Sequence, residues 1–312
     1  MLRKLIKRLK FFVSLLIVAV LGIWYFSYSN PNVNDVNSTV SVSGNKIMSV
    51  VFMDVGQGDC TFVTLPDNKT LLIDGANNGD GQSILSYLKE LNVERLDYIV
   101  ATHPHADHIG GLPYIINNID VGEVFAPKIY SQDIPTTKTY ENFLLSVKNK
   151  GKKISAAKGG QTLFEGEGYK GECFSPNSDR NDGLNNYSVV LKLTFGNDSF
   201  LFTGDAEAET EKEMLEKGYN LDSDVLKLGH HGSSTSSSKE FLTAVSPKYG
   251  VISCGRNNTY GHPHNETISA IKAIKGFSEL YRTDTQKTIT ALSKGNGNIV
   301  FKTGGKTIVT ED

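Results

Sequence analysis

Short apolar runs separated by polar turns recur from residue 46 to the end of the chain. Runs bounded by Gly, Pro, Asn and Asp are typical of strands. They predict strands over residues 48–52, 61–65, 71–73, 96–101, 121–125, 187–195, 200–203, 225–228 and 249–254, with further short strands up to residue 309. Apolar residues at helical spacing predict helices over residues 83–91, 112–117, 142–153, 206–217, 239–245 and 267–275. Because strands and helices alternate, we expect one α/β domain over residues 46–312.

One pair of strands is expected to form a β-hairpin. Val189, Leu191, Leu193 and Phe195 alternate with polar residues, and Gly196–Ser199 supplies a turn before the next apolar run. By contrast, residues 159–186 are rich in Gly, Asn, Asp and Ser and show no readable pattern.

The first 29 residues differ from the rest of the chain. Five basic residues and no acidic residue lie within the first ten positions, and an apolar run follows over residues 11–26. We interpret this segment as one N-terminal hydrophobic helix that acts as a membrane anchor or as a signal segment. The run is shorter than the ~20 residues of a typical membrane span, so both interpretations stay open. Residues 30–45 form a polar linker.

The same segment predicts the location of the domain. Basic residues on the N-terminal side of an apolar run keep that end cytoplasmic. We therefore expect a single-pass protein of the cell membrane with an extracellular domain, or a secreted protein if the segment is cleaved.

The charge distribution excludes a broad surface for polyanions. Beyond residue 29 there are 27 basic and 34 acidic residues, a net charge of −7. Any contact with nucleic acid would therefore be local. A basic patch of Lys148, Lys150, Lys152 and Lys153 is either a solvated helix end or such a local contact.

The three cysteines, Cys60, Cys173 and Cys254, are too few and too scattered for a disulfide framework. We expect them to be small buried hydrophobic side chains.

The candidate chemistry lies in histidines and aspartates that follow predicted strands. All seven histidines fall into three short segments, and one of these, Thr102–Gly111, contains His103, His105, Asp107 and His108. The other two contain the pairs His230 with His231 and His262 with His264. Imidazole and carboxylate groups at this spacing are typical of sites for zinc and neighbouring transition metals. We therefore expect a metal site in a loop at the end of a strand.

Two further aspartates occupy the same kind of position. Asp74 follows the strand over residues 71–73, and Asp205 follows the strand over residues 200–203. An aspartate there also caps helices, and Asp205 directly precedes a predicted helix. Because polar residues follow several strands in this way, a shared site explains the arrangement better than capping does.

These residues lie in motifs that resemble the metallo-β-lactamase superfamily. The matching stretches are Asp54–Asp59, Leu71–Gly75, Thr102–Gly111, Asn186–Leu191, Phe202–Asp205, Leu226–Ser233 and Tyr260–His264. The His-x-His-x-Asp-His motif is typical of the whole superfamily. The stretches Asp-Val-Gly-Gln-Gly-Asp and Gly-His-His-Gly-Ser are similar to the extracellular domain of the ComEC family of competence DNA-uptake proteins. The resemblance implies an αβ/βα four-layer sandwich.

The resemblance also implies a set of metal ligands. His103 and His105 would hold one metal ion, and Asp205 would bridge it to a second. The second ion would be held by Asp107, His108 and His230. His231 is either the true ligand in place of His230 or a group that contacts the substrate.

Other residues would act on the substrate or orient the ligands. Asp74 would orient the histidine segment. Asn186 belongs to the same outer group, and the substrate cleft would be lined by Gln57, Asp59, His262 and His264. A histidine in such a cleft binds a phosphate oxygen or protonates a leaving group. The candidate catalytic groups are accordingly Asp107, His231, His262 and His264.

One departure from the superfamily pattern concerns the first metal site. Most hydrolases of the superfamily supply a further histidine before the bridging aspartate, whereas residues 109–204 contain none. The nearest polar residues are Asn185, Asn186 and Ser188, as in ComEC-like chains. Amide and hydroxyl oxygens are harder and weaker ligands, so we expect one or two zinc ions, with manganese as the alternative.

The resulting hypothesis is an extracellular metal-dependent phosphodiesterase. It would be a nuclease that cleaves single-stranded DNA with metal-activated water, working with a DNA-uptake or channel partner. Two alternatives stay open. One is hydrolysis of another extracellular ester, such as a phosphorylcholine or wall-polymer phosphodiester or a lactone. The other is a binding module without catalysis.

Overall fold

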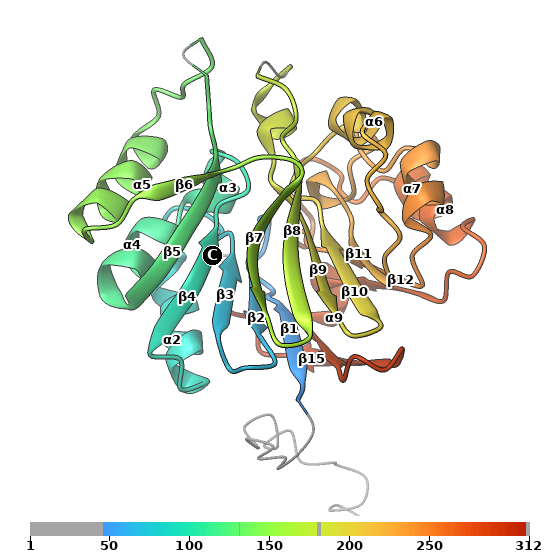
Figure 1. The fold of residues 1–312 in the computed structure, drawn as a ribbon, viewed down its shortest axis with the longest axis horizontal. Helices are drawn as coiled ribbons and strands as arrows, with labels where there is room; N and C mark the ends of the chain where they lie inside the picture. The colour runs from blue at the N-terminus through green and yellow to red at the C-terminus, as the bar shows by residue number, and fades with distance from the viewer. Residues whose placement is uncertain (1–45, 131, 180–181, 310–312) are drawn as a thin grey trace, which may run out of the picture. The chain divides into compact units, whose positions relative to one another are not determined.

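Two β-sheets packed face to face lie at the centre of the fold (Figure 1). The computed structural model describes residues 46–130, 132–179 and 182–309, which belong to one compact unit over residues 44–312. The expected N-terminal hydrophobic helix and the linker lie outside the described residues. Within the described ranges, no helix has the length and apolar character needed to cross a membrane.

The first sheet has the strand order β15-β14-β1-β2-β3-β4-β5-β6. Its strands are Met48–Phe52 (β1), Thr61–Thr64 (β2), Thr70–Ile73 (β3), Arg95–Val100 (β4), Asp120–Pro127 (β5), Ile154–Ala157 (β6), Thr288–Ser293 (β14) and Ile299–Gly305 (β15). Strands β3 to β6 run parallel, so their carboxyl ends lie at one edge of the sheet.

The second sheet has the strand order β13-β12-β11-β10-β9-β8-β7. Its strands are Gln161–Gly166 (β7), Tyr169–Ser175 (β8), Val190–Phe195 (β9), Asp198–Phe202 (β10), Val225–Lys227 (β11), Tyr249–Ile252 (β12) and Glu279–Arg282 (β13). Strands β10 to β13 run parallel, which again places their carboxyl ends at one edge.

Helices cover the outer face of each sheet (Figure 1). The α-helices of the described residues are Gly81–Glu90 (α2), Ala106–Ile109 (α3), Leu112–Asn118 (α4), Lys138–Asn149 (α5), Ala208–Glu216 (α6), Lys239–Val245 (α7), Asn265–Lys272 (α8) and Thr283–Gln286 (α9). The short helix α9 connects β13 of the second sheet to β14 of the first. Two short 3₁₀ helices, Leu184–Tyr187 (η2) and His230–Gly232 (η3), lie at strand ends.

The alternation of side chains along the strands separates the buried residues into layers. On β1, Met48, Val50 and Phe52 pack between the two sheets, whereas Val51 packs towards the helices of the first sheet. A third cluster lies between the second sheet and α6, α7 and α8. This order of helices, sheet, sheet and helices confirms the α/β class, with two sheets enclosed by helices.

Several elements differ from the expectation at their ends. Helix α5 begins four residues earlier than expected because Thr137 caps it, accepting a hydrogen bond from the backbone N–H of Tyr140 (3.3 Å). In the predicted hairpin, Phe195 pairs with Asp198, so the turn consists of only two residues, Gly196 and Asn197. Residues 187–189 lie outside β9.

The segment without a readable pattern contains a pair of strands, β7 and β8. Only Phe164 is buried on β7, so this strand lacks the apolar alternation that identifies the others. The three cysteines are free and buried, which confirms that prediction.

Candidate metal centre

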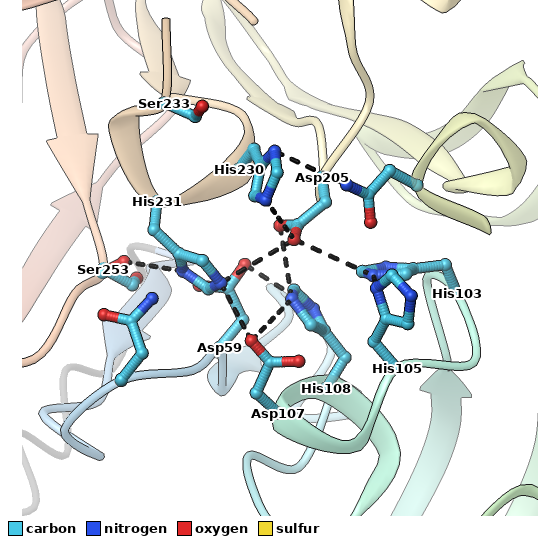
Figure 2. A network of polar contacts seen from close by, with 12 residues as sticks. Asp59, His103, His105, Asp107, His108, Asp205, His230, His231, Ser233 and Ser253 are labelled. Carbon is cyan, nitrogen blue, oxygen red and sulfur yellow. Dashed lines mark hydrogen bonds and ion pairs between the residues drawn. The ribbon is translucent and has the colours of Figure 1, made fainter. Parts of the chain in front are cut away.

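The predicted site residues meet where the carboxyl ends of the parallel strands of both sheets face each other. The histidine segment follows β4, Asp205 follows β10, His230 and His231 follow β11, and Ser253 follows β12. Figure 2 shows the side chains of His103, His108, His230 and His231 surrounding Asp205. Both sheets therefore contribute to one site.

The histidine segment turns into a one-turn helix at Ala106, which corrects the expectation of a simple loop. The turn brings Asp107 and His108 to the same side as His103. Gly110 ends it against the segment that follows β3, and a Cβ atom at this position would lie 2.2 Å from the backbone N of Asn78. Only glycine allows this close approach.

Asp74 holds the histidine segment in place. Its Oδ1 accepts a hydrogen bond from the backbone N–H of Thr102 (2.8 Å), and its Oδ2 accepts from Thr102 Oγ1 (2.7 Å) and His108 Nδ1 (2.8 Å). Asp74 has a positive φ of 59°, a conformation of local backbone strain. Because Nδ1 of His108 is committed to Asp74, its Nε2 is left for the centre.

The other buried histidines are oriented in the same manner. His231 Nδ1 donates to the carbonyl oxygen of Ser253 (2.9 Å), which turns its Nε2 towards Asp107 Oδ2 (3.2 Å). His103 Nδ1 lies 3.1 Å from Thr102 Oγ1, and its Nε2 lies 3.0 Å from His105 Nδ1. Three ring nitrogens, the Nε2 atoms of His103, His108 and His231, are thus directed inwards.

The spacing of these atoms fits a metal ion. Two ligand atoms that each bind a tetrahedral zinc ion at about 2.0–2.1 Å lie about 3.3 Å apart. His108 Nε2 and Asp205 Oδ1 lie 3.2 Å apart, both are buried, and neither has a hydrogen-bond partner in the part of the chain that the structure describes. Two clusters with ligand atoms within 4.8 Å of one another are His103 with His108 and Asp205, and Asp107 with His108 and His231. These clusters are able to hold a divalent metal.

The electrostatics of the site also favour a cation. Burial disfavours the charged form of His108, but the carboxylates of Asp205 and Asp74 outweigh it and hold the pKa of His108 well above its ordinary value. Burial likewise opposes charge on His231, yet Asp205 and the hydrogen bond to Asp107 raise its pKa to about 10. A divalent ion would supply the positive charge that these carboxylates attract.

Lys227 is a site residue that the sequence interpretation missed. It forms a buried ion pair with Asp59, with side chains that are 3% and 6% exposed. Burial alone would raise the pKa of Asp59, but Lys227 together with His231 and His108 outweighs burial and lowers this pKa to about 2. Asp59 Oδ1 in turn lies 3.6 Å from His231 Nδ1, the ring nitrogen opposite the one that faces Asp107. The ion pair therefore helps to fix the orientation of the His231 ring. The feature of the sequence that could have identified it is that this lysine interrupts the apolar run Val225–Leu228.

The two adjacent histidines have different surroundings. His231 belongs to two of the metal-binding clusters and is buried. His230 Nε2 lies 3.8 Å from Asp205 Oδ2, while its Nδ1 lies near Glu207 Oε1 (3.2 Å) and Thr235 Oγ1 (3.1 Å). The geometry therefore favours His231 as the ligand of the second ion and places His230 at the rim.

Different surroundings also distinguish the three polar residues that lie where most hydrolases of the superfamily supply a further histidine. Asn186 Oδ1 accepts hydrogen bonds from the backbone N–H of Glu207 (3.1 Å) and from Thr210 Oγ1 (2.8 Å), so its side chain fixes the start of α6. Ser188 Oγ accepts from the backbone N–H of Asp205 (3.0 Å). Asn185 Oδ1 is buried and has no hydrogen-bond partner among the described residues, which makes Asn185 the amide placed to serve as a ligand.

The remaining predicted residues lie along the rim. The ring of His262 stacks at 6.2 Å on that of His231, and its buried Nδ1 has no hydrogen-bond partner within the described ranges. His264 is held by the backbone N–H of Ser234 (3.0 Å), and its other ring nitrogen faces Tyr260 O. Gln57 Oε1 accepts from the backbone N–H of Gly255 (3.1 Å), which ties the loop after β12 to the site.

Comparison with known families agrees with this geometry. The model of the metallo-beta-lactamase superfamily matches residues 53–256. The chain belongs to this superfamily. Two solved structures support the metallo-beta-lactamase fold alone, each with a TM-score of 0.50. CmlA, a diiron beta-hydroxylase from Streptomyces venezuelae, is 16% identical, with 74% of this chain and 52% of that chain covered. A metal-dependent hydrolase of the beta-lactamase superfamily is 13% identical, with 78% and 98% covered.

Three of the curated relatives are competence or recombination proteins. ComE operon protein 3 of Bacillus subtilis is 30% identical over 77% of this chain and 32% of its own length. Competence protein ComA of Neisseria gonorrhoeae is 34% identical over 76% and 31%. Recombination protein 2 of Haemophilus influenzae is 29% identical over 73% and 27%. The chain thus spans about a third or less of these relatives, and the similarity is consistent with a ComEC-like domain.

Proposed function

We propose that this protein is a metal-dependent phosphodiesterase that cleaves single-stranded DNA. The observation that carries the proposal is the convergence of buried ligand atoms, above all His108 Nε2 and Asp205 Oδ1, at the spacing of metal ligands and without a hydrogen-bond partner among the described residues. The similarity to competence proteins over about three quarters of the chain supports DNA as the substrate.

The chain offers ligands for two ions on either side of Asp205. His103, His105 and Asn185 would hold one ion. Asp107, His108 and His231 would hold the other. A pair of divalent ions supplies activated water and offsets the charge of a phosphodiester. Zinc fits the imidazole ligands, and manganese fits the first site, where an amide oxygen takes the place of a histidine.

Residues at the rim would bind and orient the substrate. Asp107 is 30% exposed and its Oδ2 lies 3.2 Å from His231 Nε2, so the carboxylate that would hold the second ion lies on the open side of the centre, where the substrate would enter. Burial and the neighbouring His231 and His230 lower the pKa of His262 to about 4. A neutral His262 favours hydrogen bonding to a phosphate oxygen over protonation of a leaving group.

The cellular setting is part of the same proposal. The basic start and apolar run of the first 29 residues support anchoring in the cell membrane with the domain outside, and secretion is the alternative. The competence relatives support a role beside a DNA-uptake or channel partner. Digestion of the domain by protease added to intact cells would support this placement, and full protection would contradict it.

The decisive experiment uses the full-length chain with Zn²⁺ or Mn²⁺ on end-labelled single-stranded DNA. The matched control is Asp205→Asn, which retains the shape of a buried side chain and removes the bridging carboxylate. Metal-dependent cleavage by the wild type alone is the expected result. If DNA stays intact while bis-p-nitrophenyl phosphate is hydrolysed, the substrate would instead be a wall-polymer or phosphorylcholine diester. A metal-loaded protein that hydrolyses neither would refute the phosphodiesterase.

A further inference from the structure

An apolar pocket of about 240 Å³ opens beside the metal centre, between the histidine segment, the end of β5, helix α5 and strand β6. These elements lie side by side in Figure 1. His103 forms part of its wall, so the pocket and the metal site share a side chain. Building on the proposed function, we infer that this pocket binds the nucleobase of the nucleotide next to the scissile phosphate.

The size and lining of the pocket fit one flat ring. Pockets for drug-sized ligands have volumes of roughly 300–1,000 Å³, so this smaller one suits a single ring system. Apart from His103, Lys128 and Tyr140, its lining residues are apolar, including Phe143 and Leu144. Tyr140 is half-buried and offers aromatic surface, and stacking on aromatic side chains is the usual way in which proteins hold unpaired bases.

Lys128 supplies a positive charge at the mouth of the pocket. It is exposed, follows the carboxyl end of β5 and lies with its Nζ 4.9 Å from the centre of the Tyr130 ring. The basic patch at residues 148–153 lies further from the carboxyl end of β5. Ile154 pairs with Val124 in the parallel strand, so the lysines before Ile154 are level with the part of β5 that precedes Val124, whereas Lys128 follows the end of that strand. A backbone phosphate joined to a base in the pocket would therefore meet Lys128, with the metal centre beyond His103.

The test measures binding of a labelled, hydrolysis-resistant phosphorothioate tetrathymidylate and of its abasic counterpart to the full-length protein with Mn²⁺. One base that stacks in the pocket should make the thymidylate bind about 5- to 150-fold more tightly than the abasic strand. The variants Leu144→Gln and Ala156→Phe, which remove or fill apolar space in the pocket, should bring this ratio close to one.

Two neighbouring variants serve as matched controls. Leu145 is 41% exposed and Leu144 is 39% exposed, but only Leu144 lines the pocket, so Leu145→Gln should retain the ratio. Ser155→Phe adds the same bulk on β6 outside the pocket lining and should also retain it.

A wild-type ratio near one, or an unchanged ratio in both pocket variants, would overturn the inference. Octyl phosphate that competes better than thymidine 5′-phosphate would assign the pocket to an alkyl chain and would overturn it as well. Base preference without DNA cleavage would support the pocket and count against the proposed nuclease. DNA cleavage without base preference would support the proposed nuclease and count against the pocket.

Discussion

Replacing Lys227 by methionine removes the cation from the buried pair with Asp59 and leaves the buried carboxylate without its closest ionic partner. Breaking one partner of a buried ion pair costs about 3–5 kcal/mol. The pKa of Asp59, about 2 against an ordinary 3.8, gives a similar contribution of about 2.5 kcal/mol at neutral pH. We therefore expect Lys227→Met to lower the free energy of unfolding by about 3 kcal/mol, or Tm by roughly 6–12 °C.

The assay is thermal unfolding of the metal-free protein, followed by far-ultraviolet circular dichroism. The matched control is Lys248→Met, since Lys248 also pairs with an aspartate (Asp224, 2.8 Å) but its side chain is 55% exposed. Exposed pairs contribute about 0–1 kcal/mol, so this variant should unfold close to the wild type. The double variant Lys227→Met/Asp59→Asn removes the unpaired charge and should regain much of the loss.

The pH dependence follows from the sign of the shift. The pKa of Asp59 lies below its ordinary value, so its ionisation stabilises the fold above about pH 4, and this contribution is lost as the pH falls towards 2. Without Lys227, protonation of the buried carboxyl becomes favourable, and the gap between wild type and variant should narrow from pH 7 to pH 4. A variant that unfolds within about 2 °C of the wild type, or a double variant no more stable than the single one, would refute the reasoning.

Three further predictions concern the metal. Removing a residue that only hydrogen-bonds to a metal ligand weakens metal binding by roughly 10–100-fold, so His231→Ala, which removes a ligand itself, should weaken it more. His230→Ala should weaken metal binding less than His231→Ala. Competition with a chromophoric chelator measures both affinities, and equal losses would contradict the assignment. Asn185→Ala should lower the affinity of one site and leave Tm nearly unchanged, while Asn186→Ala should cost about 1–3 kcal/mol of stability because Asn186 Oδ1 holds two donors. Chelation should lower stability by about 2.7 kcal/mol relative to protein with free metal at a hundredfold excess over Kd; an unchanged Tm would show that the folded site binds no metal.

The α/β class and the position of the site were predictable because both depend on local patterns, whereas the four-layer arrangement was implied only by the resemblance to the superfamily. Apolar runs identified the strands, and strand ends placed Asp74, His103 and Asp205 together. Strand β7 was not predicted because only one of its side chains is buried, so its sequence lacks an apolar face.

The finer division of roles depends on backbone geometry that adjacent residues do not reveal. His230 and His231 both have positive φ values, 47° and 53°, and this turn decides which ring enters the centre. In the same way, η2 directs the side chain of Asn186 towards α6 and leaves Asn185 Oδ1 without a hydrogen-bond partner in the described part of the chain. Lys227 was missed because its partner, Asp59, is 168 residues away in the sequence.

The ligand set is divided between the two sheets, and Asp107 and His231, which face each other at 3.2 Å, are 124 residues apart in the sequence. Each proposed ligand set is completed by a residue from the other half of the chain, Asn185 for one ion and His231 for the other. A chain that crosses a membrane unfolded would therefore complete both sets only after the sheets have docked. The ion found in the mature protein would then record which metals were available in the compartment where folding was completed.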